Sequence, residues 1–410
     1  MGPCFHTVSV ATRSGSLAGM DFALPDELAA LQQTVRRFAQ EKVAPRAREI
    51  DQSGEYPQDI FDGLRDADLL GLCIPEEYGG SGAGIMGLTL AIEEVTKYSN
   101  VIGLMLLLTR LPTGPIMIAG SEEQKLKYLP SIASGETRAA FCLSEPGAGS
   151  DVAGMQSQAI ADPDVPGGWI LSGTKCWISG VSQADWFTVF AKTGDRASRH
   201  HDAITGFIVP ADRLGVSRPR VDRKMGVKGI DTGEVVFDNV KLGPDDVIGA
   251  VGGFRLAMMG LNAMRPIVAA RGIGLAEGAL MYATEYVKNR AAFGSTIAQM
   301  QGIQWEIAKC ATEIEAARLL TYRAAWLADQ GKFTKEFVPM LSMCKYYAAE
   351  VAVKASGLAV QLLGAAGYME DHPTEQWYRD ARQLTIVEGT SQVQLGLIAK
   401  GVLGHDMWWD

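Results

Sequence analysis

The sequence predicts an α+β protein with an N-terminal helical domain, a middle β-barrel or β-sandwich domain and a C-terminal four-helix bundle. Three observations support this prediction. The chain has 410 residues, which exceeds the usual size of a single domain and indicates two or three packed units. Helical periodicity at both ends of the chain encloses a stretch of short β-rich runs. The helical runs of the last part are long and closely spaced, which is typical of a bundle.

Residues 20–136 are expected to form the N-terminal helical domain. Apolar residues recur at roughly helical spacing from Leu28 to Val43, and prolines and a glycine-rich cluster at 78–82 interrupt the pattern. Residues 1–19 show neither a helical period nor a continuous apolar stretch. We therefore expect a disordered extension there and not a signal peptide, with a targeting peptide as the alternative.

Residues 137–250 are expected to form the β-domain, since runs rich in Val, Ile, Phe and Trp alternate there with Gly, Pro and Asp turns. Residues 251–410 are expected to form the bundle, with helices at 268–290, 301–330 and 337–365. The first of these helices is rich in Ala and Gly, which suits close packing in the core or between subunits. The terminal segment 407–410 contains two Trp residues and is expected to pack on a neighbouring subunit.

The bulk composition argues against several classes of partner. A net charge of −9 disfavours a nucleic-acid partner, which would need a basic face. No membrane partner is expected, because the apolar run at 101–109 is stopped by Arg110 and Pro112. The six cysteines include no CxxC pair and have no histidine companions, so no metal site is predicted. They are typical of a reduced intracellular protein, and we expect a cytoplasmic location.

Glu388 is the first candidate for chemistry. It lies between an apolar run and the small, hydroxylated residues Gly389, Thr390 and Ser391. Apolar surroundings disfavour the charged form of a carboxylate and raise its pKa toward that of a useful base. The simpler alternative is a solvated carboxylate at a helix end.

Two upstream segments could approach a ligand. Residues 144–151 hold glycines, a proline and serines, a composition that cannot form a helix interior and differs from a phosphate loop. An ordinary turn is the alternative. In the segment 173–180, Trp177 and Ser179 are two residues apart and hence on one face of a strand, where they could cover a flat heterocycle. Alternatively, Trp177 belongs to the core.

Together these segments resemble the acyl-CoA dehydrogenase family of flavoproteins. The run Glu-Pro-Gly-Ala-Gly-Ser-Asp at 145–151 is similar to one family signature, and Tyr-Arg-Asp-Ala at 378–381 with Glu-Gly-Thr-Ser at 388–391 is similar to another. Arg290, Phe293, Gly294 and Gln301 match a third motif. The matches extend from about residue 22 to residue 403 and imply the same three-domain order.

The resemblance implies α,β-dehydrogenation of an acyl-CoA thioester to the 2-enoyl-CoA. Glu388 would remove the α-proton, because the family's other base position, before Arg265, is Met264. FAD would accept the hydride, since no protein side chain can. Electrons would pass to an electron-transfer flavoprotein, and the assembly would be a homotetramer formed by a dimer of dimers. The implied cofactor-binding residues are Phe141, Leu143, Ser144, Gly149, Ser150, Trp177, Ser179, Arg290, Phe293, Gln301, Gln361, Gly364, Thr390 and Gln392.

The residues expected to contact the substrate are Ser150, Leu104, Leu107, Leu108, Asn262, Arg265, Val387 and Gly389. Arg265 would orient Glu388, or else form a structural ion pair. The bulky leucines of the helix from residue 101 favour an apolar acyl chain. Arg110, near the end of that helix, is the exception: if it faced the pocket without a partner, a carboxylate on the acyl tail would be preferred.

Two alternative functions remain. An acyl-CoA oxidase of the same fold would use O2 in place of the electron-transfer flavoprotein, whereas a nitroalkane oxidase prefers Asp as its base. A flavin-free acyl-CoA-binding subunit of a heteromer would not need Glu388, Arg290, Gln301 or Trp177, which this chain retains.

Overall fold

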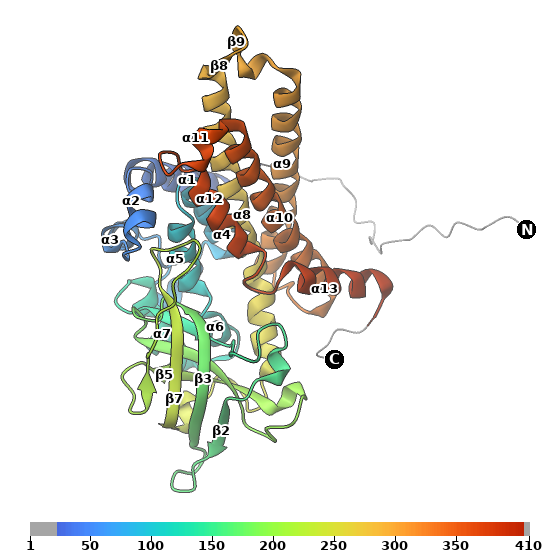
Figure 1. Cartoon of the computed structure of the whole chain (residues 1–410). Coiled ribbons are helices and arrows are strands. Elements are labelled where there is room, and N and C mark those ends of the chain that lie inside the picture. Colours follow the sequence, from blue (N-terminus) through green and yellow to red (C-terminus); the bar gives the residue numbers. More distant parts are fainter. Residues whose placement is uncertain (1–22, 406–410) are drawn as a thin grey trace, which may run out of the picture.

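The structure is a computed structural model that describes residues 23–405. The expected extension at 1–19 and the tryptophan-rich segment at 407–410 lie outside the described residues. The β-domain lies at one end of the molecule and the long helices of the C-terminal part at the other, with the N-terminal helices beside both (Figure 1). The predicted order of helical, β and helical domains is confirmed.

The N-terminal domain packs seven helices around a largely apolar core. Its central elements are α4 (Gly84–Thr96) and α5 (Asn100–Arg110), both of which are almost entirely buried. The others are α1 (Asp26–Phe38), α2 (Ala47–Ser53), α3 (Gln58–Asp66), α6 (Gly114–Ala119) and α7 (Glu122–Ala133). The stretch Asn100–Ala119 is apolar and long enough to cross a membrane, but 78 % of that window is buried inside the fold.

The middle domain is a curled seven-stranded sheet in the order β1-β4-β2-β3-β7-β6, with β5 paired to β4. Most neighbours are antiparallel, but β4 runs parallel to both β1 and β2. The strands are β1 (Ala139–Cys142), β2 (Gln158–Ala161), β3 (Trp169–Ser179), β4 (Trp186–Lys192), β5 (Ile204–Pro210), β6 (Val216–Ser217) and β7 (Thr232–Leu242).

The C-terminal domain is built on α8 (Phe254–Asn289), α9 (Gln301–Asp329), α10 (Val338–Leu363) and α13 (Ser391–Leu403). Two short helices, α11 (Ala365–Tyr368) and α12 (Thr374–Leu384), precede the Glu388 turn, and the strand pair β8 (Ala291–Ala292) and β9 (Ser295–Thr296) joins α8 to α9. Helix α8 begins well before the predicted start at residue 268, because Pro266 lies inside the helix and does not end it.

The small residues of α8 pack against other helices of the same chain. A Cβ atom at Gly274 would lie 2.2 Å from the carbonyl oxygen of Glu93, and one at Gly278 would lie 2.0 Å from that of Lys97. At Gly272 it would meet the backbone of α10. Glycine therefore lets α8 approach α4 and α10 to backbone contact, as close packing requires.

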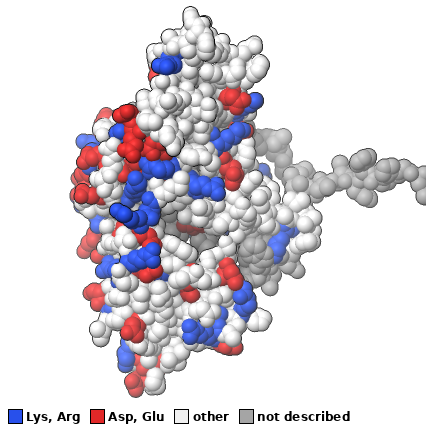
Figure 2. All heavy atoms as spheres, viewed as in Figure 1, with Lys and Arg blue, Asp and Glu red and all other residues white. Residues whose placement is uncertain are grey.

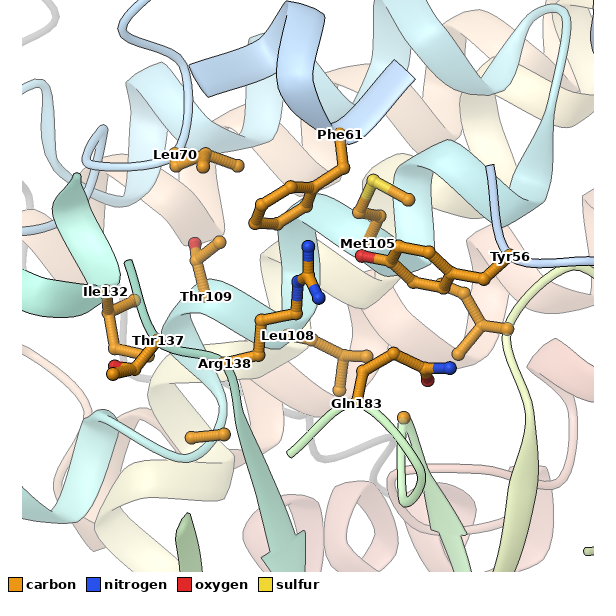
Figure 3. A pocket seen from close by; sticks show the side chains of 13 residues that line it. Tyr56, Phe61, Leu70, Met105, Leu108, Thr109, Ile132, Thr137, Arg138 and Gln183 are labelled. Atoms are coloured by element: carbon orange, nitrogen blue, oxygen red, sulfur yellow. The ribbon is translucent and has the colours of Figure 1, made fainter. Parts of the chain in front are cut away.

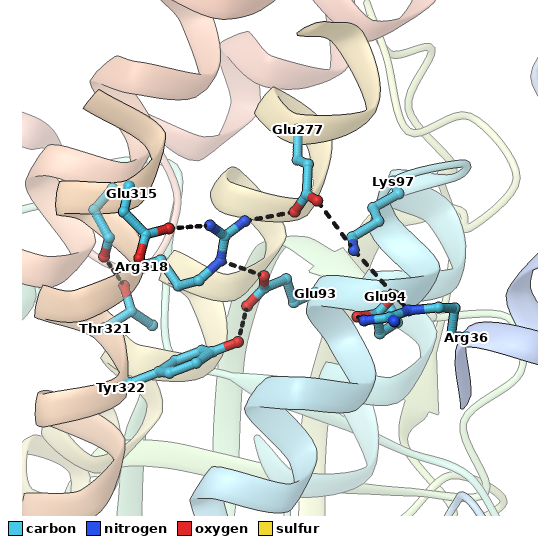
Figure 4. A network of polar contacts seen from close by, with 10 residues as sticks. Arg36, Glu93, Glu94, Lys97, Glu277, Glu315, Arg318, Thr321 and Tyr322 are labelled. Atoms are coloured by element: carbon cyan, nitrogen blue, oxygen red, sulfur yellow. Dashed lines mark hydrogen bonds and ion pairs between the residues drawn. The ribbon is translucent and has the colours of Figure 1, made fainter. Parts of the chain in front are cut away.

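A network of charged side chains joins the N-terminal domain to the bundle (Figure 4). Its centre is the buried pair Glu93 and Glu94 on α4. Arg318 of α9 bridges Glu93 and Glu277 of α8, so that three helices meet at one guanidinium. The remaining members, which contact Glu93, Glu94 or Glu277, are Arg36, Lys97 and Tyr322.

Candidate active site

A cavity of about 830 Å³ opens where the three domains meet. Its walls come from α5, the end of β1 with the following loop, the end of β3, helix α8, and the segment that joins α12 to α13. The predicted candidate segments at 141–151, 177–179 and 387–390 therefore lie around one space, although up to 250 residues separate them in the chain.

Glu388 lies on the cavity wall in a left-handed backbone conformation, with φ +55°, and Gly389 follows with φ +87°. This conformation is uncommon for a residue other than glycine and is often found at functional sites. The residue is half-buried, and no side chain within residues 23–405 forms a hydrogen bond with its carboxylate. The carboxylate is thus available to a molecule in the cavity.

Three interactions fix the turn that carries Glu388. Gln394 of α13 donates from Nε2 to the carbonyl oxygens of Glu388 and Gly389, at 3.1 and 3.3 Å. Lys345 of α10 donates from Nζ to the carbonyl oxygen of Gly389 at 2.6 Å. Thr390 caps α13 by accepting the backbone N–H of Val393. Glycine is favoured at Gly389 because of its left-handed φ, and a Cβ there would also displace Gln394 Nε2, which lies 2.6 Å from that position.

Burial raises the pKa of the Glu388 carboxyl, and the positive charges of Lys345 and Arg271 partly oppose this shift. Burial also lowers the pKa of the Lys345 ammonium to about 8, an effect that the charge of Glu388 partly reverses. The result is a carboxylate with a higher proton affinity than a solvated glutamate, which favours a role as a base.

The glycine-rich loop is anchored by a buried ion pair. Lys175 of β3 donates from Nζ to Glu145 at 2.8 Å and to the carbonyl oxygen of Leu143 at 3.1 Å. Glu145 also accepts the backbone N–H groups of Gln156 and Ser157. The loop thus has a fixed shape, and its far side presents Ser144, Gly149 and Ser150 to the cavity.

Trp177 and Ser179 line the same cavity and the buried Ile178 lies between them, as the strand alternation predicts. The pairing of β3 with β7 shifts register between Lys175 and Ile178. Trp177 adopts φ +59° and is 58 % exposed. It is therefore not a core residue. It lies on the cavity wall with Ser179, Phe141 and Leu143.

These residues fit a flavin. An exposed indole in a left-handed backbone conformation is unfavourable unless another group covers it. Beside it are the apolar surfaces of Phe141 and Leu143 and the hydroxyl groups of Ser144, Ser179 and Thr390. An aromatic heterocycle with polar edges can use both kinds of surface.

The cavity wall includes many of the residues singled out from the sequence. They are Leu104, Leu108, Phe141, Leu143, Ser144, Gly149, Ser150, Trp177, Ser179, Arg265, Val387, Glu388, Gly389 and Thr390. Their roles in binding stay predictions.

Other predicted residues lie elsewhere. Leu107 packs in the protein core and does not line the cavity. Asn262 donates to the carbonyl oxygen of Phe333 and does not reach the cavity. The remaining ones are exposed and outside this cavity of the single chain: Arg290, Phe293, Gln301, Gln361, Gly364 and Gln392.

Arg265 lines the cavity but does not contact Glu388. Its Nη1 donates to Ser342 Oγ at 2.8 Å and to the carbonyl oxygen of Val338 at 3.3 Å, both on α10. The cations that act on Glu388 are Lys345 and Arg271, which sequence reasoning missed. A signal for Arg271 was present, since it is the one charged residue between Ala269 and Ala276 in the Ala- and Gly-rich helix.

A second, smaller cavity of about 40 Å³ lies behind Leu108 (Figure 3). Arg138 dominates it, with its guanidinium 4.0 Å from the ring centre of Phe61 and near Tyr56. Leu108 lines both cavities and is the residue that they share.

Comparisons with known proteins agree with this geometry. The chain matches the acyl-CoA dehydrogenase N-terminal domain at residues 25–136, the middle domain at 140–240 and the C-terminal domain at 252–403. An acyl-CoA dehydrogenase of Bacillus subtilis is 39 % identical over 377 residues, which are 91 % of this chain and 97 % of that protein.

Solved structures are similar over the same length. Butyryl-CoA dehydrogenase from Megasphaera elsdenii has a TM-score of 0.89 and 36 % identity, covering 94 % of this chain and 100 % of that one. A solved chain from a study of the electron transferring flavoprotein of Acidaminococcus fermentans gives the same values. Since three domain families cover nearly all of the described residues in the same order, the chain belongs to the acyl-CoA dehydrogenase family.

Proposed function

We propose that the protein catalyses the α,β-dehydrogenation of an acyl-CoA thioester to the 2-enoyl-CoA, with Glu388 as the base. The observation that carries the proposal is the Glu388 carboxylate, which has no hydrogen-bonding side-chain partner in residues 23–405 and lies on the wall of a largely apolar cavity. Family membership supports acyl-CoA dehydrogenation as the general reaction.

Removal of an α-proton requires a base and donors for the developing enolate oxygen. Glu388 supplies the base, and its raised pKa increases its affinity for the proton that it accepts. The backbone N–H of Glu388 is our candidate oxyanion donor, because the left-handed turn is held by Lys345 and Gln394. Apolar side chains such as Leu104 and Leu261 exclude water around the reacting carbons.

FAD is the cofactor that we assign to the wall formed by Trp177, Ser179, Phe141 and Ser144. When bound, FAD supplies the acceptor for the hydride that leaves the β-carbon. The support for this assignment is the exposed Trp177 beside hydroxyl and apolar groups, together with membership of the family.

We also propose a homotetramer in which one subunit completes the cofactor site of another. The ends of α8 and α9 form an arm with few charged side chains on its visible face (Figure 2). Phe293 at the tip is 96 % exposed, and Trp305 on α9 is 59 % exposed. Such large exposed apolar groups are typical of an interface. Arg290, Phe293 and Gln301 would then reach a neighbouring subunit.

An electron-transfer flavoprotein is the proposed electron acceptor, and similarity to the chain from the Acidaminococcus study supports it. We also propose that the protein is located in the cytoplasm. This location is supported by the five cysteines within residues 23–405, which are free and buried.

The test is anaerobic mixing of the purified yellow protein with acyl-CoA thioesters in a stopped-flow spectrometer. The wild type should bleach, and Glu388→Gln should keep its flavin but lose about 10²–10⁴-fold in the rate of bleaching. Glu370→Gln, on an exposed residue far from the cavity, is the control. Bleaching of Glu388→Gln at the wild-type rate would refute the assignment of the base. Steady consumption of O2 would favour an oxidase.

A further inference from the structure

Arg271 is a buried arginine on the wall of the acyl cavity. It lies on α8, is only 1 % exposed, and lines the cavity together with Leu104, Leu108 and Gln383. Its side chain passes over Gly103 of α5, where a Cβ atom would lie 3.4 Å from Arg271 Cγ. The absence of a side chain at Gly103 therefore leaves room for the arginine between α5 and α8.

The guanidinium of Arg271 is held by neutral groups. Nε donates to Asn100 Oδ1 at 2.9 Å, and Nη2 donates to Gln383 Oε1 at 2.7 Å. Among residues 23–405 no carboxylate lies within ion-pair distance of it, and no group accepts a hydrogen bond from Nη1. The protein thus fixes the orientation of the guanidinium but leaves one edge without an acceptor.

This arrangement is costly unless a further group pairs with the charge. A buried ion without a partner is strongly unfavourable. Many buried groups escape this cost by becoming neutral, but arginine hardly ever loses its proton. Burial lowers the pKa of Arg271, but only to about 10, so the group is still charged at neutral pH. The carboxylates that act on it from a distance are Asp380 and Glu388.

The other buried arginine that the sequence suggested for tail recognition is placed differently. Arg110 lies at the end of α5, where its Nη1 would contact a Cβ at Gly114, and it does not line the cavity. Its Nε and Nη1 lack partners too, but they face the interior near Cys73. Of these two arginines, only Arg271 combines an open donor edge with a place on the acyl cavity wall.

We propose that Arg271 binds a carboxylate at the end of the acyl chain, so that the preferred substrates are ω-carboxyacyl-CoA thioesters. Leu104 and Leu108 would contact the methylenes between the thioester and that carboxylate. Asn100 and Gln383 would hold the guanidinium so that its open edge meets both carboxylate oxygens, a geometry for which arginine is well suited. The inference rests on the proposed function, and it replaces the expectation of a purely apolar tail.

The test uses the flavin-loaded protein and matched pairs of thioesters. Succinyl-, glutaryl- and adipyl-CoA are each compared with the branched acyl-CoA in which methyl groups replace the two terminal carboxylate oxygens. In the wild type, the best carboxylate substrate should exceed its partner in kcat/KM by roughly ten- to a hundredfold, the range expected for hydrogen bonds between charged groups. Binding of the same thioesters to Glu388→Gln, measured by calorimetry, should show the same preference.

Arg271→Met should remove this preference: kcat/KM should fall much further for the carboxylate member of each pair than for its methyl-branched partner, even though loss of the cation near Glu388 affects both. Arg271→Lys should keep part of the preference. Arg110→Met is the control, since it removes a buried arginine that does not line the cavity. An arginine that acted only on the charge of Glu388 would change both members of each pair equally.

The outcomes separate the two proposals. Preference of the wild type for the methyl-branched member of every pair, or an equal loss for both members in Arg271→Met, overturns the role of Arg271. If only the methyl-branched thioesters reduced the flavin, the role of Arg271 would also be overturned, but the proposed function would stand. Failure of every thioester to reduce the flavin overturns both. If Arg271→Met does not fold, the wild-type comparison and Arg271→Lys still decide.

Discussion

The ammonium of Lys345 lies 2.6 Å from the carbonyl oxygen of Gly389, the residue that follows the proposed base. This contact ties the turn of Glu388 to the middle of α10. It also places a positive charge close enough to Glu388 to oppose the effect of burial on its pKa. Lys345 is thus a positioning residue that acts through both the backbone and the charge of the turn.

Lys345→Met should shift the pH profile of flavin reduction. Glu388 acts as a base only when ionised, so the rate should rise with pH through its raised pKa. Loss of the nearby cation raises that pKa further, so the rise in rate should move to higher pH. The measurement is the rate of anaerobic bleaching by a saturating thioester from pH 5 to 9.

The control is Lys354→Met, which removes an exposed lysine of the same helix that pairs with Glu313. Its profile should match that of the wild type. An unshifted profile in Lys345→Met, with the rate lowered equally at every pH, would mean that Lys345 only holds the turn.

Leu108→Ala should lengthen the preferred acyl chain. Leu108 separates the main cavity from the smaller one beside Arg138, and truncation would join the two. Each additional buried methylene contributes about 0.8 kcal/mol, so the optimum in a series of straight-chain thioesters should move to longer chains. Leu107→Ala is the comparison, because Leu107 packs in the core and should affect stability more than the optimum. An unchanged optimum in Leu108→Ala contradicts the role of Leu108 as the partition.

Gly274→Ala should destabilise the protein. A methyl group there would lie 2.2 Å from the carbonyl oxygen of Glu93, and overpacking of this kind typically costs 1–3 kcal/mol, about the range expected here. Gly357→Ala on α10 is the matched control, since its methyl group would lie 3.4 Å from the ring of Tyr378. The control should be neutral or slightly stabilising because alanine favours helix. Thermal unfolding of the two variants measures the difference, and equal melting temperatures would contradict the close contact of α8 with α4.

Lys175→Met should weaken the hold on the glycine-rich loop. Removal of one partner from a buried ion pair leaves an uncompensated charge and costs roughly 3–5 kcal/mol. We expect a lower melting temperature and faster loss of flavin on dilution, because Glu145 organises the loop that carries Ser144 and Ser150. Lys309→Met, from an exposed pair with Glu306, should change neither. If the variant retained flavin as well as the wild type, the ion pair would not be needed to hold the loop in its flavin-binding shape.

The sequence by itself determined the three-domain order, because helical and strand periodicities depend on residues close together in the chain. It also pointed to Glu388 and the loop at 144–151, since their glycines permit backbone conformations that other residues avoid and their motifs resemble those of the family. A prediction from a local rule failed where tertiary packing overrode that rule. Pro266 did not end α8, although proline usually breaks a helix interior.

Only the tertiary structure decided which side chains meet. Lys345 and Gly389 are 44 residues apart, and Arg271 and Gln383 are 112 apart, so neither pair leaves a local pattern. The same holds for the surroundings of a side chain: Leu104, Leu107 and Leu108 of α5 look alike in sequence, yet of these three only Leu104 and Leu108 line the cavity. Packing of helices from distant parts of the chain sets these surroundings, and with them the charge at the wall of the acyl cavity.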